Sequence, residues 1–169
     1  MRRSFVLAFL ALALLLGVSG FAAASDANGN HDSYIWFVGE PPGADTAIAP
    51  DGSTITMQGS GTFKAGPGKT ATGGGTYSLS SGGSGSWVVT GVQGFVFYGE
   101  TAAPGLPPGS AGGEVKLDVT LSKGASGVLT IYCILGSPPA GKEEGITLIL
   151  GRDGQFTKQA GGNTLFIRL

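Results

Sequence analysis

Apolar and polar residues alternate along most of the chain after residue 33, and an alternation of period two predicts β-strands. The clearest run is 115–121, where alternate residues from Val115 to Leu121 are apolar and the residues between them are polar. No helical period occurs in this part of the sequence. We expect strands at residues 34–38, 54–63, 76–79, 87–98, 115–121, 129–135, 146–150, 155–158 and 164–168.

Clusters of Gly, Pro, Asn and Asp separate these runs. About eight or nine short strands at such spacing are typical of an antiparallel sandwich or a closed antiparallel sheet. We favour an all-β, Gly-rich antiparallel β-sandwich, Ig-like or jelly-roll-like, as a single domain over residues 33–169. The run 87–98 contains Gly91 and Gly94, so we expect it to bend or bulge and to serve two sheets.

Three segments share the pattern Gly-x-Gly-Thr/Ser-aromatic: GSGTF, GGGTY and GSGSW, which end at Phe63, Tyr77 and Trp87. An aromatic ring can cover the space that glycine leaves on a neighbouring strand. We therefore expect these rings to pack over glycines in the core. The alternative is an exposed aromatic surface that stacks on sugar rings, for which the candidates are Trp36, Trp87 and Tyr98.

The N-terminus has the features of a secretory signal peptide. Arg2 and Arg3 precede the apolar run 5–18, and Ala22 to Ala24 supply the small residues of a cleavage site. The run is shorter than the roughly 20 residues that a membrane-spanning helix needs. We expect a signal peptide over 1–24, cleavage between Ala24 and Ser25, and secretion by the Sec route rather than the twin-arginine route, with no membrane span in the mature protein.

The mature chain would begin with a polar tail over 25–32, SDANGNHD. Its oxygen-bearing side chains are spaced two residues apart, as in a calcium-binding EF-hand loop: Asp26, Asn28, Asn30 and Asp32. The position of the invariant glycine holds His31, and that of the closing glutamate holds Phe37. We favour a flexible spacer and keep a calcium site as the alternative.

Composition excludes several classes of function. After cleavage, eight basic residues stand against eleven acidic ones, a formal charge of −3, so no basic stripe is present for nucleic acid. Gly and Pro make up about 27% of the mature chain, a level that demands many tight turns. Cys133 is the only cysteine, which rules out an intrachain disulfide. We expect it to be a buried small hydrophobe beside Leu129, Ile131 and Leu135.

No catalytic signature is present. His31 is the only histidine and lies in the polar tail, so a histidine base held near a nucleophile is excluded. One His and one Cys cannot make a zinc site. The segment AGPGKT lacks the first glycine of a phosphate-binding loop, because that position holds Phe63. We assign no catalytic residue and no cofactor apart from the calcium alternative.

The segment 138–145, PPAGKEEG, lies between two expected strands and is the candidate binding loop, with Lys142, Glu143 and Glu144 as its charged residues. Glycine-rich strand edges also favour self-association. We expect a secreted, non-enzymatic binding or structural protein whose partner is an extracellular protein or glycan. The alternatives are a glycosidase-like secreted hydrolase with paired carboxylates and a calcium-dependent glycan-binding module.

Overall fold

The part of the chain that the structure describes consists of antiparallel strands joined by turns and loops. The computed structural model describes residues 32–39, 43–151 and 154–169, and these contain eleven strands and no helix. The all-β antiparallel class is therefore confirmed. The strands are β1 (Ser33–Val38), β2 (Asp45–Ile48), β3 (Thr54–Lys64), β4 (Thr70–Leu79), β5 (Gly83–Glu100), β6 (Ser110–Leu121), β7 (Ser126–Cys133), β8 (Gly145–Leu150), β9 (Gly154–Phe156), β10 (Lys158–Gln159) and β11 (Thr164–Arg168).

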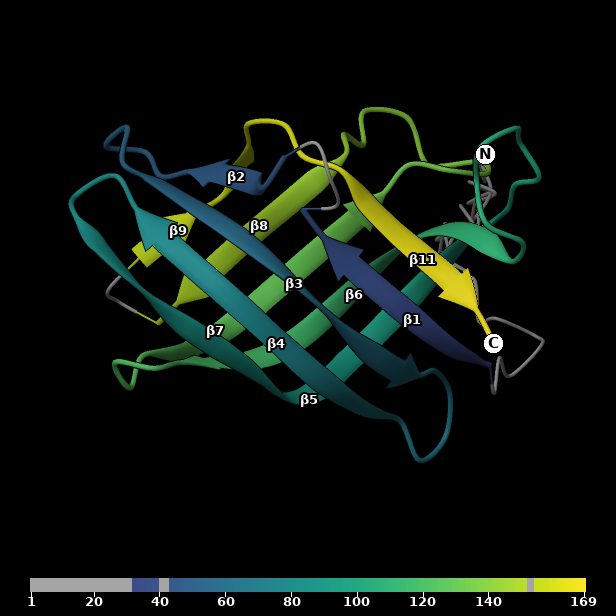
Figure 1. Ribbon diagram of the computed structural model, residues 1–169, viewed down its shortest axis with the longest axis horizontal. Helices are drawn as coiled ribbons and strands as arrows, with labels where there is room; N and C mark the ends of the chain where they lie inside the picture. The colour runs from purple at the N-terminus through teal and green to yellow at the C-terminus, as the bar shows by residue number, and fades with distance from the viewer. Residues whose placement is uncertain (1–31, 40–42, 152–153) are drawn as a thin grey trace, which may run out of the picture.

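The strand pairings return to their starting point. β3 pairs with β4 along one edge and with β1 and β2 along the other. In the same way, β6 pairs with β5 along one edge and with β7 and β11 along the other. Because β1 also pairs with β11 and β4 with β5, the order β3–β4–β5–β6–β11–β1 closes on β3. Figure 1 shows two crossing layers, with β1, β3, β4 and β11 in front of β6, β7 and β8.

β5 carries the sheet from one layer to the other. It pairs with β4 over residues 83–88 and with β6 from Trp87 to Glu100. Its register with β6 shifts between Val89 and Gly91, again between Val92 and Gly94, and a third time further on. Such shifts bend a strand and increase its twist. The bulges expected in this run are confirmed. The expectation that it serves two sheets is not, because β4, β5 and β6 belong to one continuous sheet.

The core lies between the two layers. Alternate residues from Val115 to Leu121 are at most 4% exposed, as the sequence alternation predicts. The indole rings of Trp36 and Trp87 stack with their centroids 5.6 Å apart. Burial of large apolar side chains contributes roughly 25 cal/mol per Å² of apolar area, so these rings are main sources of stability.

Glycines on β3 make room for the two indoles. A Cβ atom at Gly59 would lie 2.7 Å from Cζ2 of Trp87. One at Gly61 would lie 2.7 Å from Cζ2 of Trp36. Atoms packed at interior density leave no space for a methyl group at such distances. Gly59 and Gly61 of the first motif are thus required both by the indole packing and by the close approach of the β4 backbone at Gly74 and Thr72.

The expected packing of rings over glycines holds for two of the three motif aromatics. Trp87 covers Gly59, and a Cβ atom at Gly85 would lie 3.1 Å from the Tyr77 ring. Phe63 differs, because it stacks on Tyr34 with ring centroids 5.0 Å apart. The third ring of the motif therefore belongs to an aromatic cluster and covers no glycine.

Some strand boundaries differ from the sequence expectation. β2 was not expected, β4 begins at Thr70 rather than at 76, and β6 begins at Ser110 rather than at 115. Glycine has a low strand propensity, so 73–75 and 112–113 are typical of loops by sequence. In the fold their backbones pair with neighbouring strands, and rings such as Phe95 over Gly113 fill the space above them.

Candidate functional site

The outer surface of β2 to β5 is covered by hydroxyl-bearing side chains. On β3 the inward residues Ile55, Met57 and Phe63 are at most 2% exposed, so the polar residues between them face outward. β4 and the first half of β5 continue the alternation. Val88, 52% exposed, lies between Ser86 and Thr90 on the same face of β5. The outward polar side chains, which we call the hydroxyl face, are Thr46, Thr54, Thr56, Gln58, Ser60, Thr62, Thr70, Thr72, Thr76, Ser78, Ser84, Ser86 and Thr90.

This face is almost free of charge. Within residues 46–63 and 70–90 the only charged residue is Asp51, which lies in the turn between β2 and β3. Ser53 donates backbone and hydroxyl hydrogen bonds to the Asp51 carboxylate at 2.9 and 2.6 Å, and the hydroxyl bond is the main reason that the pKa of Asp51 is lowered. Lys64 lies at the border, at the end of β3.

The strand register aligns the hydroxyls across the strands. Thr46 of β2 lies opposite Thr56 of β3, Thr56 opposite Ser78 of β4, and Ser78 opposite Ser84 of β5. The hydroxyl oxygens of Thr46 and Thr56 are 3.1 Å apart. A hydroxyl has one donor hydrogen and two acceptor lone pairs, so each member of such a pair keeps hydrogen-bonding capacity for a ligand.

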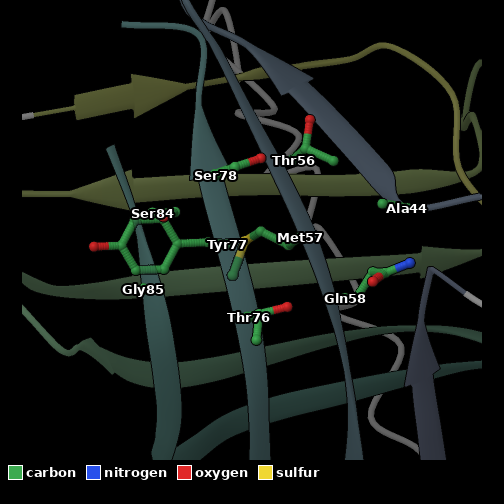
Figure 2. A pocket seen from close by; sticks show the side chains of 9 residues that line it. All are labelled: Ala44, Thr56, Met57, Gln58, Thr76, Tyr77, Ser78, Ser84 and Gly85. Carbon is green, nitrogen blue, oxygen red and sulfur yellow. The ribbon is translucent and has the colours of Figure 1, made fainter. Parts of the chain in front are cut away.

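A shallow hollow of about 530 Å³ lies on the hydroxyl face, near the start of β3 and the end of β4, with Ser84 and Gly85 of β5 also lining it. Figure 2 shows the side chains of Thr56, Gln58, Thr76 and Ser78 on these two neighbouring strands. Met57, completely buried, and Tyr77, 4% exposed, adjoin the hollow from the core side.

The hollow has a rigid floor. From the core side, Nε1 of Trp87 donates to the backbone carbonyl oxygens of Gln58 and Thr76, each at 3.2 Å. This donor therefore joins β3 and β4 beneath the hollow, in addition to their backbone ladder. A surface fixed in this way loses little conformational entropy when it binds a ligand.

The aromatic-surface prediction is wrong. Trp36 is 0%, Trp87 1% and Tyr98 7% exposed, so none of the three rings forms a platform. Both tryptophans are in the core because the strand alternation points them inward. Burial is the main cause that raises the pKa of Tyr98, whose hydroxyl lies 3.4 Å from the Glu114 carboxylate.

The charged loop over 142–144 is tied to the sheet by two of its three candidate residues. Nζ of Lys142 lies 2.6 Å from the Glu114 carboxylate and 4.9 Å from the centre of the Tyr132 ring. The hydrogen bond to Glu114 is the main reason that the pKa of Lys142 is raised. The Glu144 carboxylate accepts hydrogen bonds from the backbone amides of Thr164 and Ile134, at 3.0 and 3.2 Å. These contacts give Lys142 and Glu144 a role in anchoring the loop.

Glu143, the third candidate of this loop, is exposed. Its backbone carbonyl accepts a hydrogen bond from the Gln159 side chain at 3.4 Å. The contacts of this loop bring no second acid beside the Glu143 side chain with which it could form a catalytic pair. We therefore build no site on Glu143.

The calcium candidates lie mostly beyond the structure. Asp26, Asn28 and Asn30 are outside the described residues, and so are the signal peptide and its cleavage site at Ala24 and Ser25. Asp32 is described, and its carboxylate lies 2.8 Å from the Arg168 guanidinium. Within the described ranges, no group of three or more His, Cys, Asp or Glu residues is arranged to hold a metal ion.

An acid that the sequence analysis did not single out is buried at the start of β2. Asp45 has 0% exposure, and its Oδ1 accepts a hydrogen bond from the backbone amide of Asn163 at 2.5 Å. Its Oδ2 is buried without a hydrogen-bond partner among the described residues. The pKa of Asp45 is raised to about 6, mainly by burial and in smaller part by the negative charge of Glu144. Because no surface of Asp45 is exposed, a substrate cannot touch it. The proximity of Asp45 and Glu144 therefore does not favour a hydrolase with paired carboxylates.

Cys133 is free and buried, as expected. Burial raises the pKa of its thiol to about 11. A nucleophilic cysteine needs a thiolate and an exposed position, so the geometry gives this residue a packing role.

Comparison with known proteins does not assign this chain to a family. No protein-family model, no curated protein and no solved structure matches the chain. Among the described residues, no helix has the length and apolar character that crossing a membrane requires. The function is therefore argued from the hydroxyl face alone.

Proposed function

We propose that the protein is a secreted, non-enzymatic binding module whose hydroxyl face binds neutral glycans outside the cell. The observation that carries this proposal is the uncharged, hydroxyl-covered surface of β2 to β5 with the hollow of about 530 Å³ on it.

The chemistry of the face matches that of a sugar. Serine and threonine hydroxyls donate and accept hydrogen bonds, and the Gln58 amide does both through separate atoms. Sugar hydroxyls have the same dual capacity. A charged ligand would lose hydration on this face without gaining an opposite charge, so the face favours a neutral partner.

The test is retention of residues 25–169 on insoluble neutral polysaccharides such as cellulose, chitin and starch. We expect retention that is equal at low and high salt, because screening acts on charge pairs. Ser78→Asp, which places a carboxylate beside the hollow, should abolish retention. Thr147→Asp on β8, in the other layer, is the matched control and should retain the protein.

Two outcomes would overturn the proposal. One is a folded protein that binds none of these polysaccharides. The other is equal loss of retention in the Ser78→Asp and Thr147→Asp variants, which would place the binding surface elsewhere. A thermal melt of each variant verifies that it is folded.

The finer architecture and the export route are parts of the same proposal. The two crossing layers support a sandwich-like packing (Figure 1), in which both layers belong to one closed order of strands rather than to the two separate sheets of an Ig-like or jelly-roll-like sandwich. The N-terminal sequence supports removal of residues 1–24 during Sec export. The mass of the protein recovered from the medium of an expressing cell tests the cleavage, and a mature chain that keeps residues 1–24 would contradict it.

A further inference from the structure

Hydroxyl side chains form a row that runs across four strands, in which Ser84, Ser78 and Thr56 line the hollow and Thr46 lies opposite Thr56, outside it. The order along the row is Ser84, Ser78, Thr56 and Thr46, one residue from each of β5, β4, β3 and β2. Neighbouring strands lie about 4.8 Å apart, so the row spans roughly 14 Å between its outer members. This length exceeds that of a single sugar ring.

A second hollow continues the row beyond β2. It has a volume of about 520 Å³ and lies between the start of β2 and the segment 160–163 that joins β10 to β11. The two hollows share Ala44. Figure 2 shows Ser84, Ser78, Thr56 and Ala44 in this order from left to right, so the shared residue Ala44 lies at the end of the first hollow opposite Ser84.

The far wall of the second hollow is tied to β2. The Thr46 amide donates to the carbonyl oxygen of Gly161 at 3.1 Å, and the Ala160 amide donates to that of Thr46 at 2.9 Å. Asn163 is held by Asp45, as described above. Among the residues that the structure describes, none that lines either hollow is charged. The second hollow is lined mainly by glycine and alanine, with Thr46 and Asn163 as its polar side chains.

The energetics of such a path select for long ligands. A hydrogen bond that replaces bonds to water contributes only a small net free energy. The translational and rotational freedom lost on association costs several times as much. No exposed aromatic ring adds stacking on this row. A single sugar unit that contacts two or three hydroxyls therefore gains too little free energy to bind. A chain that follows the row makes more contacts, while the loss of translation and rotation occurs only once.

We propose that the two hollows form one site for a linear neutral polysaccharide chain, which lies across β5, β4, β3 and β2 and ends in the hollow beside the segment 160–163. This inference rests on the proposed glycan-binding function and specifies its ligand as an extended chain rather than a terminal sugar. Ser84 and Thr46 then mark the two ends of the row.

The test is calorimetric titration of residues 25–169 with glucose and with the disaccharides and hexasaccharides of cellulose, chitin and starch. At least one hexasaccharide should bind ten times or more as tightly as its disaccharide. Thr46→Val and Ser84→Ala, at opposite ends of the row, should each weaken hexasaccharide binding about fivefold. Thr62→Val is the control, because Thr62 is on the same face but outside the row.

The outcomes separate this inference from the proposed function. Equal affinity for a disaccharide and its hexasaccharide would overturn the extended site and leave the glycan-binding function in place. An equal effect of Thr62→Val would overturn the assigned path. Absence of binding to every sugar, together with no retention on the insoluble polysaccharides, would overturn both proposals.

Discussion

Replacing Asp45 with asparagine should change how the stability of the protein depends on pH. The carboxyl group is buried, accepts one hydrogen bond from the Asn163 amide and lies near the negative charge of Glu144. Its pKa is raised from 3.8 to about 6, chiefly by burial. Asparagine has the same shape and can accept the same hydrogen bond, but it carries no charge at any pH of interest.

The sign follows from the two states of the chain. Between pH 3.8 and about 6, the folded protein holds a proton on Asp45 that the unfolded chain has released, so the free energy of unfolding falls as pH rises. Below that window Asp45 is protonated in both states and does not lower the free energy of unfolding. Above the window the free energy of unfolding is lowered by the full amount. Two pKa units correspond to about 3 kcal/mol. Local relaxation and water penetration reduce such penalties, and we expect about 2 kcal/mol.

Urea unfolding between pH 4 and pH 8 measures this cost, with the fluorescence of the two buried tryptophans as the signal. Asp45→Asn should match the wild-type protein near pH 4 and exceed its free energy of unfolding by about 2 kcal/mol near pH 7.5. Asp51→Asn is the control with the opposite sense. The Asp51 carboxylate has a lowered pKa, so its contribution is present at neutral pH and is lost as the pH falls.

The reasoning would be refuted if the difference between Asp45→Asn and the wild-type protein were the same at pH 4 and pH 8. A variant that is less stable than the wild type at pH 7.5 would also refute it, because the charge of Asp45 would then stabilise the fold.

Three further predictions concern the core and the anchored loop. Gly61→Ala should lower the free energy of unfolding by about 3 kcal/mol, because the new Cβ would lie 2.1 Å from the carbonyl oxygen of Thr72; a loss below about 1 kcal/mol in urea unfolding would contradict this packing. Cys133 should react with a thiol reagent only as fast as the protein unfolds, and rapid labelling of the native protein at pH 8 would show that the thiol is accessible. Lys142→Met should cost about 1 kcal/mol at low salt and less at high salt, since it removes the ion pair with Glu114; a cost that does not change with salt would point to lost packing instead.

Much of the fold could be predicted from the alternation of residue types. The inward face of β6 follows from its sequence, and so does the inward position of Cys133. β2 was missed because it has only four residues, Asp45–Ile48, and begins with an acid. The glycine-rich start of β4 was missed because local propensity argues against a strand there. In the fold the Trp36 ring lies beside Gly73, and the backbones of β5 and β3 lie close to Gly74 and Gly75.

Only part of the candidate site could be predicted from the sequence. The threonines, serines and glutamine of the hydroxyl face are regularly spaced along β3, β4 and β5, and that spacing could have identified one uncharged outer face. The charged loop over 142–144 is predicted as the binding site instead, although Lys142 and Glu144 have partners on the sheet in the structure. Charge marks a residue in a sequence, but only contacts decide whether that charge is available to a ligand.

The sequence by itself determined that this protein is made of strands and which side chains share a face, because alternation is a local property of an extended backbone. Only the tertiary structure decided which strands are neighbours and in what register. That register places Thr46, Thr56, Ser78 and Ser84 in one row, stacks Trp36 on Trp87 in the core, and buries Asp45 near Glu144. These relations join residues far apart in the chain, and they depend on the packing of the whole sheet, which no local pattern specifies.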